Sequence, residues 1–266
     1  MTLASSLAAV TGPPSPGPAD FNLPAIIPWG AETGLTKPML LVGLSAVIAF
    51  VVIRAAAKPA AVVPGRLQFA GELAYDFVRN AIARDNIGSE QFMRFVPYLF
   101  TVFLFVLVNN FYGVIPFLQF PSMSHIGYPV AIAFVTWFIY NTVGVRKHGF
   151  LGYLKHECVP AGVPGWILVL LVPLEFFSNI IVRPFTLLLR LFATMFAGHL
   201  LLILFALGAE YLLLHSDNPL AIPGGIFSAV MAIAVSFLDM LIMFLQAYVF
   251  TLLSAMYIGE AISDHH

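Results

Sequence analysis

An arginine and a histidine stand inside one of the most apolar stretches of this sequence. The segment "LLLRLFATMFAGHLL" places Arg190 and His199 among leucines and phenylalanines. A guanidinium keeps its proton, so an arginine in hydrocarbon costs several kcal/mol or more unless something compensates it. Asp239 lies in a second apolar stretch further along the chain. Ionisable residues inside a membrane are typical of ion pathways and proton relays.

Helical geometry sorts these residues onto faces. At about 100° per residue, Thr194 shares the face of Arg190, where small alanines would let another helix approach closely. His199 points to the opposite side. In the second stretch, Asp239 and Gln246 are seven positions apart and share a face. We therefore expect one face to offer a cation to a neighbouring helix and the other to offer His199 and Asp239 to water.

Structural roles stay open for several polar residues. Arg183 could extend to the membrane surface, or it could form an ion pair with Glu175. The histidine and the aspartate could form a buried hydrogen bond with each other, and Asn109 and Asn110 could simply bridge helices. Arg190 is different, because no acidic residue lies three or four positions away in its own helix.

The composition indicates an integral membrane protein. Of the 266 residues, 60% are hydrophobic and only 9% are charged, whereas soluble domains carry about 25% charged residues. The net charge of −1 gives no reason to expect nucleic acid as a partner. Cys158 is the single cysteine, which excludes an internal disulfide and a cysteine-built metal site. We expect no metal and no cofactor.

Five apolar stretches are long enough to cross a bilayer, which takes about 20 residues. A helical pattern of apolar and charged residues also predicts an amphipathic helix on the membrane surface. The predicted fold class is therefore an all-α polytopic membrane protein. It has an extracytoplasmic coil at 1–34, one membrane domain at 35–262 with spans at about 35–53, 96–120, 127–145, 166–214 and 220–262, a surface helix at about 65–87, and a tail at 263–266.

The last two spans are too long to stand upright. As a helix, the segment 166–214 would be roughly 70 Å long, whereas the hydrocarbon is about 30 Å thick. An open bend at "IVRPF" would leave backbone groups unpaired in lipid. We predict one steeply tilted helix, bent near Pro173 and Pro184, that forms a hairpin with the last span through "HSDNP".

Basic residues are distributed unevenly among the loops. Nine of them lie between the first and second spans or between the third and fourth, whereas only Lys37 lies on the other side. This asymmetry predicts an N-terminus outside and a C-terminus in the cytoplasm. The first 36 residues contain no Lys or Arg, which favours a bacterial plasma membrane over the inner membrane of an organelle.

Two long signatures resemble a known family. The segments "RPFTLLLRLFATMFAGH" and "LDMLIMFLQAYVFTLLSAMYIGEA", together with "NNFYGVIP" and "PLEFFSN", are similar to subunit a of F-type ATP synthases. That subunit is the membrane stator beside the rotating c-ring. The resemblance extends from about residue 90 onward. It implies five spans and an inner-surface helix, with the last two spans forming a long tilted hairpin against the c-ring.

The resemblance also implies roles for individual residues. Arg190 matches the essential arginine that faces the c-ring carboxylates, and Gln246 matches a glutamine near it on the partner helix. Glu175 matches an acidic group toward the inner half-channel, and Asn110 matches a polar position of the outer one. Thr194 replaces the asparagine that is usual one turn after the arginine, which puts any role of that amide in doubt.

The outer half-channel carries an exchanged pair. His199 and Asp239 match its two ionisable positions, but many bacterial members have an acid at the first and a histidine at the second. The implied function is proton translocation by a non-catalytic stator, with the c-ring, b-type peripheral-stalk subunits, membrane lipid and H⁺ as partners. No phosphate-binding loop is found, so ATP chemistry would lie in partner subunits.

Three other classes compete with this interpretation. A secondary transporter would show internal repeats and a midplane substrate pocket, and we find no repeated segment. A structural scaffold would not need ionisable residues in hydrocarbon. A membrane hydrolase would need metal-binding spacing or a nucleophile in a turn motif. The choice between H⁺ and Na⁺ stays open, since the ligands would sit mainly on the c-ring.

Overall fold

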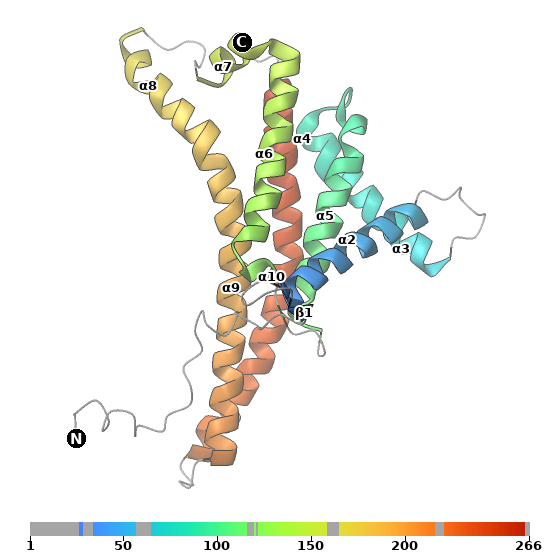
Figure 1. Cartoon of the computed structure of the whole chain (residues 1–266), viewed down its shortest axis with the longest axis vertical. Helices are drawn as coiled ribbons and strands as arrows, with labels where there is room; N and C mark the ends of the chain where they lie inside the picture. Colours follow the sequence, from blue (N-terminus) through green and yellow to red (C-terminus); the bar gives the residue numbers. More distant parts are fainter. Residues whose placement is uncertain are drawn as a thin grey trace.

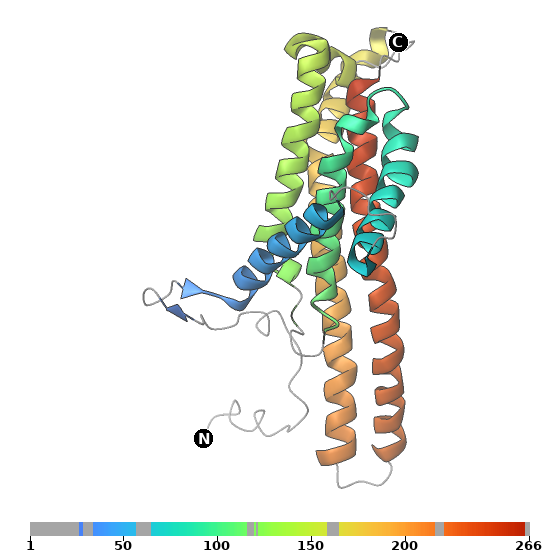
Figure 2. The same cartoon turned by 90° about the vertical axis from the view of Figure 1, so that its right-hand side faces the viewer.

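The computed structural model describes residues 27–28, 34–56, 65–115, 120, 122–158, 165–215 and 221–263. Almost all of them are helical (Figures 1 and 2). The β-structure in these ranges is one antiparallel pair of two-residue strands, β1 (Ile27–Pro28) and β2 (Gly34–Leu35). Three of these four residues lie in the segment 1–34 that was predicted as a coil, and Leu35 lies at the start of the first predicted span. The rest of 1–33 and the tail residues 264–266 lie outside the described residues.

The helices follow the predicted spans in order. Two stretches of the chain, 66–87 and 165–215, are continuously helical although each is divided into several elements. The elements are α2 (Lys37–Ala56), α3 (Arg66–Phe77), η2 (Val78–Arg84), α4 (Asp85–Ile87), η3 (Phe92–Arg94), α5 (Val96–Phe111), η4 (Ser122–Ser124), α6 (Gly127–His148), α7 (Phe150–Cys158), α8 (Gly165–Phe177), η5 (Ser178–Val182), α9 (Arg183–Glu210), η6 (Tyr211–His215) and α10 (Ala221–Ile262). The predicted surface helix corresponds to α3, η2 and α4.

Two elements differ from the prediction. The predicted span 96–120 ends as a helix at Phe111, where the Gly113 N–H donates to the Asn110 carbonyl (3.2 Å) and closes a tight turn. Four described helices are long and apolar enough to cross a membrane, and α5 is apolar but shorter. The short helix α7 was not predicted. It lies beside the C-terminal end of the chain, as Figure 1 shows.

The last two spans form the predicted hairpin. Residues 165–215 make one continuous helical run, and α10 returns beside α9 in both views (Figures 1 and 2). At the other end α8 diverges from the bundle. Pro173 lies inside α8, and the π-helical segment η5 lies just before Pro184. The helical run thus bends in the region of Pro173 and Pro184, where bending was predicted, and the helix is not interrupted there (Figure 1).

Side chains of α6 stabilise this bend. Pro184 has no N–H, so the Ile180 carbonyl loses the donor that an α-helix would provide. The Trp137 indole N–H donates to that carbonyl (3.0 Å), and one turn further the Tyr140 hydroxyl donates to the carbonyl of Asn179 (3.4 Å). The π-segment thus keeps its backbone groups paired inside an apolar environment, which is what lipid requires.

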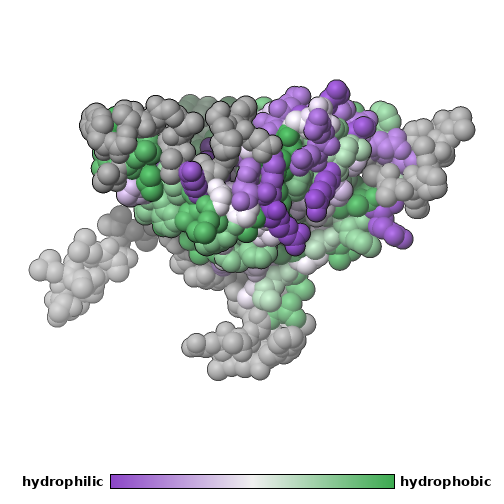
Figure 3. Space-filling view, turned by 90° about the horizontal axis from the view of Figure 1, so that it is seen from above, coloured by the Kyte–Doolittle hydropathy of each residue, from purple (hydrophilic) through white to green (hydrophobic). Residues whose placement is uncertain are grey.

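The core lies where α5, α6, α9 and α10 meet η2. Its fully buried members include Val78, Leu99, Leu187, Phe250 and Ile258. Many large apolar side chains on α2, α9 and α10 are exposed instead. Seen from above, hydrophilic side chains gather over part of the upper end of the molecule (Figure 3). This division is expected for a protein whose sides contact lipid and whose end contacts water.

Asn109 joins three elements through its side chain. It donates to the Ser45 hydroxyl of α2 (2.7 Å) and accepts from the Ser122 hydroxyl of η4 (2.8 Å). All three side chains are fully buried. The structural role that was left open for Asn109 is therefore the one that the contacts support.

We expect Asn109→Ala to destabilise the protein by about 1–3 kcal/mol, because it removes the acceptor of the buried Ser122 hydroxyl and one of the hydrogen bonds of the Ser45 hydroxyl. Asn80 is exposed on η2, so Asn80→Ala is the matched control. Thermal unfolding of the purified protein in detergent measures both. Equal melting temperatures for the two variants would contradict the bridging role.

Candidate functional site

Arg190 lies on α9 and is partly exposed. Within the described residues no carboxylate forms an ion pair with it. Its surroundings on the helix surface are small or apolar. Ala193 and Ala197 are exposed, as is Leu189 at 41%. The arginine thus borders a face of the hairpin that the described part of this chain leaves uncovered, with room for another helix to approach.

The Thr194 hydroxyl forms its hydrogen bonds within its own helix. It donates to the Arg190 carbonyl (2.8 Å), with a longer contact to the Leu191 carbonyl (3.3 Å). Threonine hydroxyls commonly make this bond in helices. The hydroxyl proton is therefore not directed at a neighbouring helix, as a donor on an amide could be.

Asp239 contacts α9 at a glycine. Its side chain is buried, at 5% exposed. A Cβ atom at Gly198 would overlap the Asp239 carboxylate, so only glycine leaves room for this contact. His199 is the next residue along and is partly exposed. The structure therefore places Asp239 against the residue that precedes His199 in α9.

Two buried amides, Asn110 of α5 and Gln246 of α10, lie near each other along α10. Asn110 of α5 donates to the carbonyl of Met243 (3.2 Å), one turn before Gln246. Both amide side chains are buried, at 0% and 4% exposed. The Oδ1 of Asn110 and the Nε2 of Gln246 have no hydrogen-bond partner in the described part of the chain. Buried polar atoms are normally paired, so these two atoms are suited to hold water.

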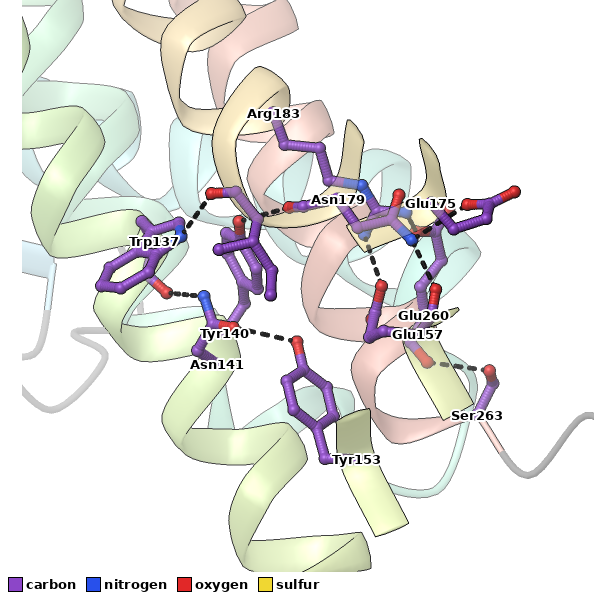
Figure 4. A network of polar contacts seen from close by, with 11 residues as sticks. Trp137, Tyr140, Asn141, Tyr153, Glu157, Glu175, Asn179, Arg183, Glu260 and Ser263 are labelled. Atoms are coloured by element: carbon purple, nitrogen blue, oxygen red, sulfur yellow. Dashed lines mark hydrogen bonds and ion pairs between the residues drawn. The ribbon is translucent and has the colours of Figure 1, made fainter. Parts of the chain in front are cut away.

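A second polar group lies at the other end of the hairpin (Figure 4). The Arg183 guanidinium is 2.9 Å from Glu260 of α10 and 3.5 Å from Glu157 of α7. It also lies over the ring of Tyr257, 5.1 Å from its centroid. The alternative of an ion pair between Arg183 and Glu175 was wrong, because Arg183 is engaged by carboxylates from two other helices.

Glu175 joins this group through an amide. The Nδ2 of Asn179 donates to the Glu175 carboxylate (3.2 Å) and to the backbone carbonyl of Glu157 (2.8 Å). Figure 4 shows Asn179 between the two glutamates. The contact places Glu175 beside the cluster around Arg183, which we call the inner cluster: Glu157, Glu175, Asn179, Arg183 and Glu260.

The antiparallel register places Arg190 between the two groups. Arg183 meets Glu260 near one end of the contact, and Gly198 meets Asp239 further along. At 1.5 Å per residue, Arg190 lies about 10 Å along the axis from Arg183 and about 12 Å from Gly198. The hairpin therefore carries a polar group on each side of its central arginine.

Comparisons with known proteins identify the family. The family model described as "ATP synthase A chain" matches residues 39–259. The chain is 54% identical to "ATP synthase subunit a" of Nocardioides sp., with both chains covered completely. It is 50% identical to the protein of that name from Paenarthrobacter aurescens, covering 94% of each chain, and 40% identical to that from Rhodococcus erythropolis, covering 95% and 92%. The chain belongs to the ATP synthase subunit a family.

Membership of the subunit a family agrees with the resemblance noted in the sequence. Together with the long apolar helices it makes this chain a multi-pass bacterial membrane protein that serves ATP synthesis and proton transport. Matches over nearly the whole length also cover both polar groups of the hairpin.

Sequence reasoning missed most of the inner cluster. Glu157 lies in α7, which was not predicted as a helix, and Asn179 lies in the π-segment. Glu260 was given no role. The segment "FLGYLKHEC" at Phe150–Cys158 gives only a weak helical signal, because it is nine residues long.

Proposed function

We propose that this chain is the proton-translocating stator subunit of a rotary ATP synthase. It crosses the membrane five times, with the N-terminus outside and the C-terminus in the cytoplasm, and its hairpin lies against the c-ring. It offers two offset aqueous half-channels, and Arg190 separates them. The chain itself catalyses no reaction, and ATP is made in partner subunits. Its other partners are the b-type peripheral-stalk subunits and membrane lipid.

One observation carries the proposal. Arg190 lies between two polar groups, on a face of the hairpin that the described residues leave uncovered. A permanent cation in hydrocarbon needs an opposite charge, and no described carboxylate of this chain pairs with it. A carboxylate on a neighbouring c-ring would supply that charge, and small residues such as Ala193 and Ala197 would let its helix approach.

The mechanism follows from the energy of a charge in lipid. A c-ring carboxylic acid that crosses lipid is neutral, because burying its anion is prohibitive. Beside Arg190 the fixed positive charge favours the anion, so the proton leaves into the adjacent half-channel. One rotational step later the acid is reloaded from the other half-channel. Because the arginine also repels protons between the channels, a proton gradient drives rotation in one direction.

The two polar groups supply the half-channels. Asp239 and His199, with the unpaired amide atoms of Asn110 and Gln246, would line the outer one. Glu175 would lie toward the inner one. Each group combines ionisable side chains with amides that can bind water, which is the composition a proton path needs.

The Gly198 contact provides a test of the outer half-channel. We expect Gly198→Ala to slow proton-driven ATP synthesis roughly tenfold, because the added methyl group displaces the Asp239 carboxylate that takes part in proton transfer. A Cβ atom at Gly43 in α2 would meet no atom within 4 Å, so Gly43→Ala is the matched control. Synthesis is measured in inverted membrane vesicles with equal amounts of assembled complex. A normal rate in Gly198→Ala would contradict the placement of Asp239 in the proton path.

A further inference from the structure

We infer that Glu157, at the end of α7, is a proton-exchange residue on the inner side of the hairpin, working with Glu260 across the Arg183 guanidinium. The inference rests on the proposed function and adds two carboxylates to its inner proton path. It also gives a role to α7, the short helix that connects α6 to α8.

A glycine on α6 positions α7. A Cβ atom at Gly144 would overlap the ring of Tyr153, so the ring packs directly on the backbone of α6. The Tyr153 hydroxyl donates to the Asn141 side chain of α6 (3.2 Å). Glu157 is one turn after Tyr153, and Asn179 holds its backbone carbonyl from the other side (2.8 Å). The carboxylate of Glu157 is thereby fixed beside Arg183 and not left on a mobile surface turn.

The charges of the inner cluster do not balance. Arg183 is shared by the carboxylates of Glu157 and Glu260, and Asn179 brings Glu175 beside them. Three acids therefore gather around one base. The side chain of Glu157 is only 6% exposed, whereas that of Glu260 is 49% exposed. Burial disfavours a carboxylate anion, and Glu157 shares the Arg183 guanidinium with Glu260, so its position suits a group that exchanges protons. Glu260, which shares the same guanidinium, is open to water.

The other titratable groups around Glu157 cannot take this part. Burial raises the pKa of the Tyr153 phenol, and the negative charge of Glu157 raises it further. Burial and the nearby carboxylates likewise raise the pKa of the Cys158 thiol. Both groups therefore stay protonated and cannot accept a proton. The groups that lie near Glu157 on the neighbouring elements are Tyr140 of α6, Glu175 of α8, Arg183 of α9 and Glu260 of α10, and Tyr257 of α10 lies against Arg183.

The alternative is a purely structural role, in which the ion pair between Glu157 and Arg183 only holds α7 against α9. An ion pair of that kind would be damaged by any change that removes the charge, and the damage would appear as instability. A proton-exchange residue behaves differently. Its loss makes proton transfer slow while the complex remains assembled, and any side chain that carries a carboxyl group at nearly the same place restores transfer.

The test uses three variants of the complete complex in inverted membrane vesicles: Glu157→Gln, Glu157→Asp and Glu90→Gln. Glu90 is an exposed carboxylate outside the inner cluster, so Glu90→Gln is the matched control. We expect Glu157→Gln to slow proton-driven ATP synthesis roughly tenfold, as removal of a proton-transfer group does. We expect Glu157→Asp to recover most of the rate and the control to match the unchanged complex.

Two further measurements separate proton exchange from a structural tie. The solvent deuterium isotope effect on ATP synthesis should rise in Glu157→Gln, because proton transfer becomes rate-limiting, and the thermal stability of the complex should stay unchanged. An unchanged rate, or a slow rate with a lower melting temperature and no larger isotope effect, would overturn the inference. Neither result would affect the assignment of Arg190, since the proposed function fails only if the complex makes ATP normally without that arginine.

Discussion

Arg190→Ala is expected to abolish proton-driven ATP synthesis while the complex still assembles. The residue is partly exposed on α9, and within the described chain no carboxylate pairs with it. Its removal therefore breaks no internal ion pair that would hold the hairpin together. What is lost is the charge that favours the anionic form of a c-ring acid at this point, and without it the acid keeps its proton.

Arg190→Lys distinguishes charge from geometry. A lysine supplies a positive charge, but a buried ammonium can lose its proton, and the barrier between the half-channels would then leak. We expect vesicles with this variant to synthesise little ATP and to leak protons. Arg66 is exposed at the start of α3, and Arg66→Ala should leave synthesis unchanged. Normal synthesis by Arg190→Ala vesicles would end the assignment of this chain as the stator.

Long apolar helices could be predicted from sequence, whereas short interfacial elements could not. The hairpin was predictable because 166–214 exceeds the membrane thickness and lipid forbids open backbone. Its π-segment follows from the missing N–H of Pro184, but the donors on Trp137 and Tyr140 come from another helix and could not be read locally. The short helix α7 was not predicted, because nine residues give only a weak periodic pattern of apolar side chains.

The outer polar group was predicted better than the inner cluster. His199 and Asp239 stand out because each is an ionisable residue in a long apolar run, and helical spacing places Asp239 and Gln246 on one face. In the inner cluster, Glu157 and Arg183 belong to separate helices and meet only after α7 folds back on α6. Their contact depends on the close approach at Gly144, which no periodicity reveals.

Asp239→Asn is expected to slow proton-driven ATP synthesis roughly tenfold or more, because an amide of the same size cannot take up and release a proton. The carboxylate lies against Gly198, and Asn fits the same space, so assembly should be nearly normal. Glu210 is exposed at the end of α9, and Glu210→Gln is the matched control. The rate is measured across a pH series on the outer side. An unchanged pH profile would count against Asp239 as the residue that admits protons.

A double variant with an acid at position 199 and a histidine at position 239 tests whether Asp239 and His199 act as a unit. We expect His199→Glu and Asp239→His each to lose most of the coupled activity and the double variant to recover part of it, because the acid and the imidazole are then both present on the same contact. Coupled residues give non-additive effects, whereas independent ones add. Gly198 favours recovery, since its missing side chain leaves space where an imidazole on α10 must fit. A double variant with the summed loss of its two single changes would show that the two side chains act separately.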